Sequence, residues 1–166
     1  PQSWRRRDYN SKECDDFRLA TKTAEIWPIF LHGVYLVNLA ATKPDHLSRS
    51  IGALVHDLKI CDLIGAQGVI FHIGSHKGAG FDSAVSQIVD AILEVLAETP
   101  DNTSLILENS AGMGGSIGST FEELGEIITK TKDNRVKICL DSQHAFAAGF
   151  DLKNSDTLLE TMDNFD

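Results

Sequence analysis

The sequence has 166 residues, of which 42% are hydrophobic and 23% are charged, a composition that predicts one soluble globular domain with a sizeable core. Its formal net charge of −9 argues against a general nucleic-acid-coating surface, which is normally basic, but not against a nuclease, because bound metal ions can supply the positive charge that meets a phosphate. No apolar run approaches the roughly 18 residues that span a bilayer, and the three cysteines include no CxxC pair, which favours a reducing compartment and no secretion.

The N-terminal part of the chain is predicted to contain a loop, a helix and a strand. Residues 1–9 form the loop, which includes Trp4 and three arginines. Apolar residues spaced three apart predict a short amphipathic helix over Ser11–Thr23. The run Glu25–His32 predicts a buried strand that ends in histidine, although Pro28 removes one donor from its hydrogen-bond ladder.

The rest of the chain predicts three helices, each followed by a strand. The helices start at Asp45, Asp82 and Thr120, side chains that can cap a first turn. The strands are short apolar runs of the kind buried on both faces in parallel sheets, and they cover Gly68–His72, Leu105–Glu108 and Val136–Asp141.

This alternation of strands and helices predicts βαβ units and a parallel sheet. A complete (β/α)8 barrel takes about 250 residues. We therefore expect an α/β fold in which a single domain, residues 1–166, is a partial (β/α)8 TIM barrel of about four consecutive βα units. A doubly wound open sheet is the alternative, but no GxGxxG motif follows any predicted strand.

Four side chains of the metal-ligand type stand at the last positions of the four predicted strands: His32, His72, Glu108 and Asp141. Side chains alternate along a strand, and each of the four shares the face of the residue two positions before it. If these faces point inward, the four groups converge over the mouth of one barrel. A buried glutamate needs cations or donors nearby, and two imidazoles with two carboxylates suit a divalent ion such as zinc or manganese.

The other histidines are less clearly placed. His144 lies three residues beyond Asp141, a spacing that favours two neighbouring metals over one shared ion, with an exposed loop histidine as the alternative. His76 could orient His72, because ligand histidines usually need a partner on the second ring nitrogen. His46 and His56 are interpreted as structural.

Four runs together resemble endonuclease IV, the family 2 apurinic/apyrimidinic (AP) endonuclease of DNA base-excision repair. They cover nearly the whole chain in the correct order, and the last is highly specific: Leu31–Leu39, Phe71–His76, Leu107–Gly112 and Cys139–Asp151. The resemblance implies a TIM barrel with a zinc cluster at the C-terminal mouth. It also implies cleavage of the phosphodiester on the 5′ side of an abasic site, leaving a 3′-hydroxyl.

The same resemblance distributes the ligands over three zinc ions, which manganese could replace in part. It gives His32 and His72 to the first ion and makes Glu108 the bridge between the first and second. Asp141 resembles a ligand of the second ion and His144 one of the third. Glu108 and Asp141 are accordingly the expected catalytic residues.

The resemblance also implies contacts with double-stranded DNA that contains abasic sites. Tyr35 falls at the abasic-nucleotide pocket, and the segment Gln2–Trp4 resembles a loop that enters the minor groove. Gln2 stands where many members have an intercalating arginine, and Arg5 is expected to attract phosphate. We expect a full-length monomer that binds no membrane, located in the cytoplasm of a bacterium or in the nucleus or mitochondria of a eukaryote.

The resemblance further implies that the first strand and the C-terminal strands, with their ligands, lie outside this chain. Only the first ion then has its full set, so we expect the polypeptide alone to bind at most about one zinc firmly, to associate or misfold, and not to cut DNA. The alternatives are a metal-dependent sugar isomerase or epimerase of the xylose-isomerase-like barrels, and an inactive metal-binding fragment. The run Cys139–Asp151 argues against the isomerase.

Overall fold

Four short strands form one parallel sheet in which every strand lies beside its neighbour in the sequence. The computed structural model describes residues 3–165, and the sheet has the strand order β1-β2-β3-β4. The strands are β1 (Phe30–His32), β2 (Gly68–His72), β3 (Ser104–Glu108) and β4 (Val136–Cys139). Parallel strands added in sequence order form part of a barrel wall, whereas a doubly wound sheet reverses its order at a switch point.

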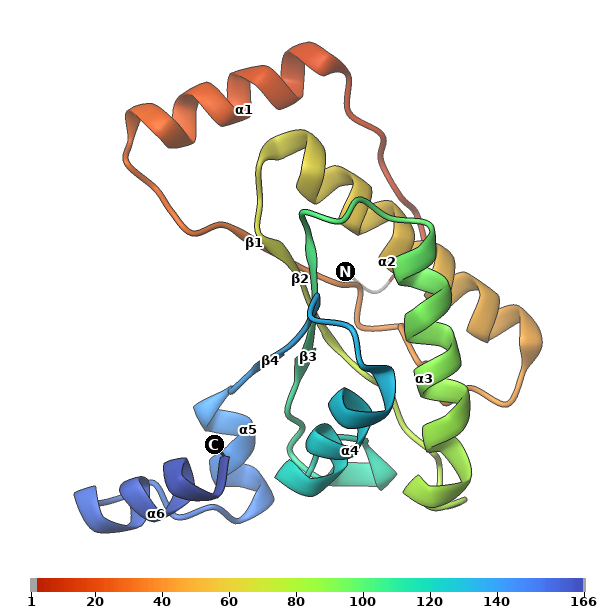
Figure 1. Cartoon of the computed structure of the whole chain (residues 1–166), viewed down its shortest axis with the longest axis vertical. Helices are drawn as coiled ribbons and strands as arrows, with labels where there is room; N and C mark the ends of the chain where they lie inside the picture. The colour runs from red at the N-terminus through yellow and green to blue at the C-terminus, as the bar shows by residue number, and fades with distance from the viewer. Residues whose placement is uncertain (1–2, 166) are drawn as a thin grey trace.

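Helices connect the strands and extend the chain at both ends of the molecule (Figure 1). The helices α2, α3 and α4 follow β1, β2 and β3, and they pack against one another and the sheet. The α1 helix and the α5–α6 pair lie at opposite ends. The bounds are α1 Ser11–Thr23, α2 Pro44–Ile64, α3 Phe81–Ala97, the 3₁₀ turn η1 Met113–Gly115, α4 Phe121–Thr131, α5 Ser142–Ala148 and α6 Ser155–Phe165. Within residues 3–165, no helix combines the length and apolar character needed to cross a bilayer.

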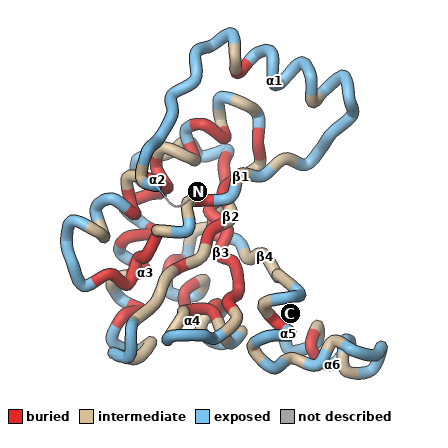
Figure 2. The backbone as a smooth tube through the Cα atoms, turned by 180° about the vertical axis from the view of Figure 1, so that it is seen from behind, coloured by how far each residue is buried: buried red, intermediate tan, exposed pale blue. Residues whose placement is uncertain are grey.

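The core lies between the sheet and the connecting helices, where the buried residues are coloured red in Figure 2. Alternate strand residues are fully buried on this side: Val69, Phe71, Leu105 and Leu107. Burying a side chain of this size contributes about 1.5–3 kcal/mol. Glu108 and His72 alternate with these residues and therefore point to the opposite, concave side. The partial TIM barrel predicted from the sequence is confirmed.

Two predicted strands are too long. The segment expected as the strand Glu25–His32 is paired only from Phe30, where its partner β2 begins at Gly68, and Trp27 before it is 74% exposed. The last strand ends at Cys139 and not at Asp141, because the chain turns there to begin α5. Apolar character alone therefore overestimates strand length at both edges of the sheet.

The predicted caps are correct only for α4. Thr120 caps that helix through its side chain, which accepts from the Glu123 amide. The Glu123 carboxylate accepts from the amides of Gly118 and Ser119 and so does not form a capping box with Thr120. Asp45 and Asp82 cap nothing, because both lie inside helices: α2 begins with Pro44, whose fixed φ suits the first helical position, and α3 follows a glycine.

Candidate metal centre

Glu108 is the central side chain of the candidate site. It ends β3, is only 5% exposed, and pairs in register with His72 on β2. One carboxylate oxygen, Oε2, lies 3.0 Å from His32 Nε2 and 3.4 Å from His72 Nδ1. The other, Oε1, lies 3.4 Å from His144 Nδ1. The two oxygens of one carboxylate therefore face two different sets of side chains.

These contacts define two donor groups that share Glu108. The first is His32–His72–Glu108 and the second is Glu108–Asp141–His144, and in each the donor atoms lie within 4.8 Å of one another. The His72 ring is adjacent to both, since its centroid is 5.2 Å from that of His32 and 5.3 Å from that of His144. The structure thus brings together all five residues singled out as ligands, and either group could hold a divalent ion.

Hydrogen bonds fix which ring nitrogen of two histidines is available. His32 Nδ1 lies 2.9 Å from the Gly33 carbonyl, and His144 Nδ1 lies 3.0 Å from the Asn109 carbonyl. A carbonyl oxygen only accepts, so each Nδ1 carries a proton, and the Nε2 of a neutral His144 presents a lone pair. His32 Nε2 faces Glu108 Oε2 at 3.0 Å, so it would present its lone pair to an ion that replaced this contact. Metal-bound histidines typically donate their second nitrogen in this way, so the donor set fits a metal such as zinc.

The surroundings also keep two of the ligands in the deprotonated state that metal binding requires. Burial lowers the pKa of His72 below its ordinary value, against the opposing effect of Glu108. The backbone N–H of His144 donates to Asp141 and lowers the pKa of that carboxyl group. Both residues are therefore prepared to bind a cation near neutral pH.

Asp141 and His144 do not lie where sequence spacing placed them. Asp141 is the N-cap of α5, and its Oδ1 accepts from the His144 amide at 2.8 Å. His144 belongs to the first turn of α5 and is partly buried, not an exposed loop residue. Residues three apart at the start of a helix lie on the same side. The donor atoms of the two side chains lie within 4.8 Å of each other and of a Glu108 oxygen, a separation that suits one shared ion as well as two neighbouring ions.

Asn109 is a site residue that the sequence pattern did not indicate. It is 2% exposed, and its side-chain amide binds the backbone of Asp141 twice. The Asp141 amide donates to Asn109 Oδ1 at 2.5 Å, and Asn109 Nδ2 donates to the Asp141 carbonyl at 3.0 Å. Its position directly after Glu108, at the end of an apolar run, was the available signal.

A hollow of about 560 Å³ lies beside the donor groups, lined by Tyr35, His72, Met113 and His144 among others. Tyr35 is 71% exposed, and its ring meets that of His72 edge-on with centroids 5.3 Å apart. The hollow has both apolar and polar lining groups and adjoins a His and carboxylate cluster. A small polar molecule could therefore reach both groups from it.

Side-chain hydrogen bonds join the loops around this hollow. Asn38, after β1, accepts from the amides of Ala40 and Ser75 and donates to the Ser75 carbonyl. Ser75, after β2, donates through its hydroxyl to the Gly114 carbonyl at 2.7 Å. Three consecutive loops are therefore connected to one another.

The remaining predicted residues lie further from the donor groups. His76 Nδ1 accepts from the amides of Gly78 and Gly80, and among residues 3–165 no hydrogen bond joins it to His72, so the geometry does not support its expected role as an orienter. Trp4 packs edge-on against His46, with centroids 5.5 Å apart. Arg5 is exposed, and Gln2 lies outside the described residues.

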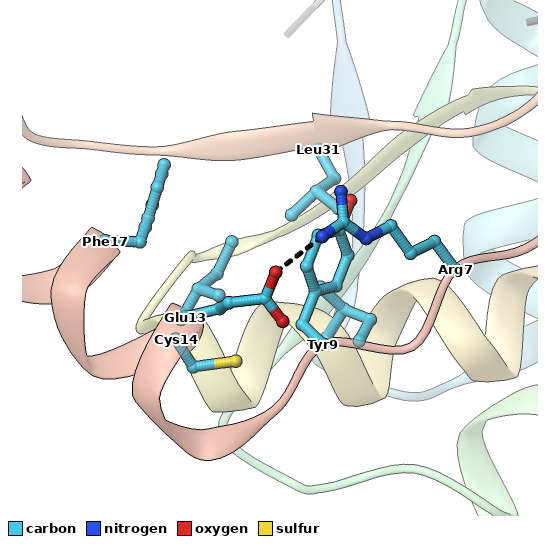
Figure 3. Close-up of a pocket in the computed structure, with 8 residues that line it drawn as sticks. Arg7, Tyr9, Glu13, Cys14, Phe17 and Leu31 are labelled. Carbon is cyan, nitrogen blue, oxygen red and sulfur yellow. Dashed lines mark hydrogen bonds and ion pairs between the residues drawn. The ribbon is translucent and has the colours of Figure 1, made fainter.

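A second hollow, of about 280 Å³, lies between α1, β1 and α2 (Figure 3). Its ionic groups are satisfied within the hollow, since Arg7 pairs with Glu13 at 2.5 Å. Leu31 lines it and follows the alternation of the strand away from His32. None of the five candidate ligands lines this hollow, so it is separate from the metal centre.

The fold and the site define a TIM-barrel protein with metal-ligand side chains at the C-terminal ends of its strands. Comparison with known sequences gives the family: residues 1–165 match the model of the xylose isomerase-like TIM barrels, and the chain belongs to that family. The barrel and the resemblance to endonuclease IV that the sequence predicted are confirmed.

Several relatives refine the match. A protein of Halothermothrix orenii named "Probable endonuclease 4" is 37% identical over the whole chain, and one of Cenarchaeum symbiosum with the same name is 33% identical. The crystal structure of endonuclease IV from Thermus thermophilus superposes with a TM-score of 0.85 at 32% identity, covering 100% of this chain and 58% of that one. A 3-keto-D-glucoside 4-epimerase from E. coli, at a TM-score of 0.67 and 15% identity over 93% of this chain and 62% of the other, shares the fold alone. The chain spans about 60% of the length of the curated relatives.

Proposed function

We propose that the protein is a zinc-dependent AP endonuclease that hydrolyses the phosphodiester bond 5′ to abasic sites in double-stranded DNA, as part of base-excision repair. The observation that carries the proposal is the Glu108 carboxylate held between two donor groups, in a chain similar to proteins named endonuclease 4. Divalent ions held by these groups would supply the Lewis acidity that phosphodiester hydrolysis near neutral pH requires. Manganese could occupy part of the same oxygen and nitrogen donor set.

The chain's own residues hold and balance this charge. His32 and His72 would bind the first ion through neutral imidazole nitrogens, and Asp141 and His144 would bind on the other side of Glu108. Glu108 would bridge the two groups, so one negative charge supports both. We assign Glu108 and Asp141 as the catalytic residues, because carboxylates at this position compensate the cations that face the scissile phosphate.

The hollow beside Tyr35 would receive the deoxyribose that lacks its base. An abasic nucleotide leaves the duplex easily because it has no base to unstack. Tyr35, with its ring exposed and its edge against His72, would pack against the sugar. The open lining has room for a sugar and a phosphate, which is what the reaction requires.

The N-terminal loop would contact the DNA backbone. Of its three arginines, Arg7 pairs with Glu13 and Arg6 donates to the Gly52 carbonyl. Arg5 is exposed, and in the described part of the chain its side chain makes no ion pair. We therefore assign the phosphate contact to Arg5, with Trp4 and Gln2 toward the minor groove.

Nicking of a defined duplex tests the proposed function. One strand would contain a single synthetic abasic site, and the matched control would contain an intact base there. We expect the full-length protein to cut the abasic strand on the 5′ side with a 3′-hydroxyl product, to lose this activity in a chelator and to regain it with zinc. Epimerisation of a ketose with no cutting of the abasic strand would instead support the sugar epimerase.

The salt dependence of binding tests the role of Arg5. Removing one arginine that neutralises a phosphate should reduce the slope of log affinity against log salt by about 0.9. We expect Arg5→Ser to show this change with the abasic duplex. Arg18→Ser, at an exposed arginine of α1 that pairs with Asp15, is the matched control and should leave the slope as it is. Equal slopes for all three proteins would refute the assignment.

A further inference from the structure

We propose that Asn109 is a positioning residue that sets the Asp141–His144 side of the metal centre. The inference rests on the proposed function, since it concerns the same metal groups. It assigns no ligand role to Asn109. Instead, the side chain and the carbonyl of Asn109 hold two ligands that lie beyond the last strand.

Strand pairing does not reach Asp141. The β4 strand ends at Cys139, so the register with β3 that places Glu108 ends there too. The amide of Asn109 continues the pairing by one bond, donating to the Cys139 carbonyl at 3.3 Å. Beyond Cys139, the hydrogen bonds to the Asp141 backbone come from the Asn109 side chain and not from a neighbouring strand.

Two hydrogen bonds join the Asn109 side chain to the Asp141 backbone. The amide oxygen of Asn109 accepts from one backbone group of Asp141, and its amide nitrogen donates to the other. A side chain that uses a donor and an acceptor on the same residue fixes both its position and its direction. Because Asp141 is the N-cap of α5, these bonds also fix where the helix begins.

Asn109 also contacts His144, the second ligand on this side of the metal centre. The Asn109 carbonyl accepts from His144 Nδ1 at 3.0 Å, which leaves His144 Nε2 as the nitrogen with a lone pair. Asp141 Oδ1 accepts from the His144 amide. Asn109, Asp141 and His144 therefore form one hydrogen-bonded unit. His32 and His72 belong to separate strands and contact no part of it within residues 3–165 except through Glu108 and the facing rings.

A selective loss of metal affinity tests this role. The probe is Co²⁺, whose visible absorption reports its ligands, titrated into the protein and its variants. Removing an outer partner of a ligand costs about 10–100-fold in metal affinity. We expect Asn109→Ala to weaken binding by the Glu108–Asp141–His144 group by this factor and to leave binding by the His32–His72–Glu108 group unchanged. The variants Asp141→Asn and His32→Gln identify the absorption of each group.

Two further variants separate positioning from general support of the fold. Asn109→Asp keeps the oxygen that accepts from Asp141 but places a second acceptor against the Asp141 carbonyl oxygen, so we again expect a loss confined to the Glu108–Asp141–His144 group. Asn38→Ala removes another buried asparagine, one that joins two other loops through three hydrogen bonds. Asn38→Ala should lower the thermal unfolding midpoint about as much as Asn109→Ala does. Both metal groups should nevertheless bind Co²⁺ with the affinity of the parent protein.

The outcomes are distinguishable. Unchanged affinity in Asn109→Ala, or equal losses at both groups, would overturn the positioning role and leave the proposed function in place. A parent protein that binds no Co²⁺ and cuts no abasic DNA would overturn the proposed function and this inference with it. If Asn109→Ala does not fold, the Asn109→Asp titration decides, with unaltered affinity again counting against the role.

Discussion

The two donor groups share one carboxylate but are held in place by different means. In the first group, His72 and Glu108 are paired residues of adjacent parallel strands, and His32 ends the neighbouring strand. In the second, Asp141 and His144 lie past the end of β4, on the first turn of α5. Strand pairing therefore positions the backbone of all three ligands in the first group, whereas the second group depends on Asn109 and on the cap of a helix.

This difference predicts two kinds of sensitivity. Ligands on paired strands are fixed by many backbone hydrogen bonds, so only changes to the ligands themselves should disturb them. Ligands on a helix cap are fixed by a few side-chain hydrogen bonds, so changes to residues that touch no metal should disturb them too. The following variants test the comparison in order of expected effect.

The largest effect is expected at the shared carboxylate. Glu108→Gln keeps the shape of the side chain but removes the charge that faces both groups, so cleavage of the abasic duplex should fall by about a hundredfold or more. The measurement is the nicking rate, with the fold checked by far-ultraviolet circular dichroism. Glu123→Gln is the matched control, because this carboxylate accepts hydrogen bonds from the loop before α4 and belongs to neither donor group. A near-parental rate in Glu108→Gln would contradict the bridging role.

The next largest effect is expected on Co²⁺ binding when one donor group loses a ligand. His72→Gln should abolish Co²⁺ binding by the first group, and Asp141→Asn should weaken the second while the first persists. Each removes a ligand, so the loss should exceed the roughly 10–100-fold that an outer partner contributes. Absorption titrations give both affinities in one experiment. Simultaneous loss of both groups in Asp141→Asn would show that they cannot be filled independently.

A smaller effect should appear in stability. Asp141→Ala removes the side-chain cap of α5 and should lower the free energy of unfolding by about 1 kcal/mol, whereas Asn caps as well as Asp and should preserve it. Urea unfolding of the metal-free proteins measures the difference. Equal stability of the Ala and Asn variants would mean that Asn109 alone fixes the start of the helix.

The smallest effect is the pH dependence of stability without metal. Burial lowers the pKa of His72 from its ordinary 6.5, so the unfolded chain takes up this proton first, and stability should fall as the pH drops below about 6.5. The pKa of Asp141 is lowered from 3.8 by the His144 amide, so its contribution is present above that pH and is lost only in stronger acid. His72→Gln should flatten the dependence near pH 6, and Asp141→Asn should not. Parallel curves for parent and His72→Gln would contradict this.

The same difference explains what the sequence could predict. Short apolar runs that end in His32, His72 and Glu108 carry the period of a strand, and the structure places all three on the concave side of the sheet. The order of the strands followed from the regular alternation with helices. These features depend on local pattern and on rules of parallel sheets that hold in any such fold.

Other features depend on contacts that sequence pattern does not contain. Asp141 follows an apolar run and therefore matches the end of a strand pattern. Nothing in the local sequence shows that β4 ends at Cys139 and that Asp141 caps a helix. The role of Asn109 requires the end of β4 to lie beside it, a long-range pairing. His76 stands near His72 in sequence, but its ring turns to the glycine amides of its own loop.

The connected loops around the Tyr35 hollow also determine what binding costs. Asn38 and Ser75 tie three successive loops together, so their backbone freedom, worth about 1–2 kcal/mol per residue, is given up when the chain folds and not when a ligand arrives. A ligand then meets a preorganised opening, and more of the contact energy appears as affinity. Such an opening favours ligands whose shape already matches it, because reshaping it would break the hydrogen bonds that join the loops.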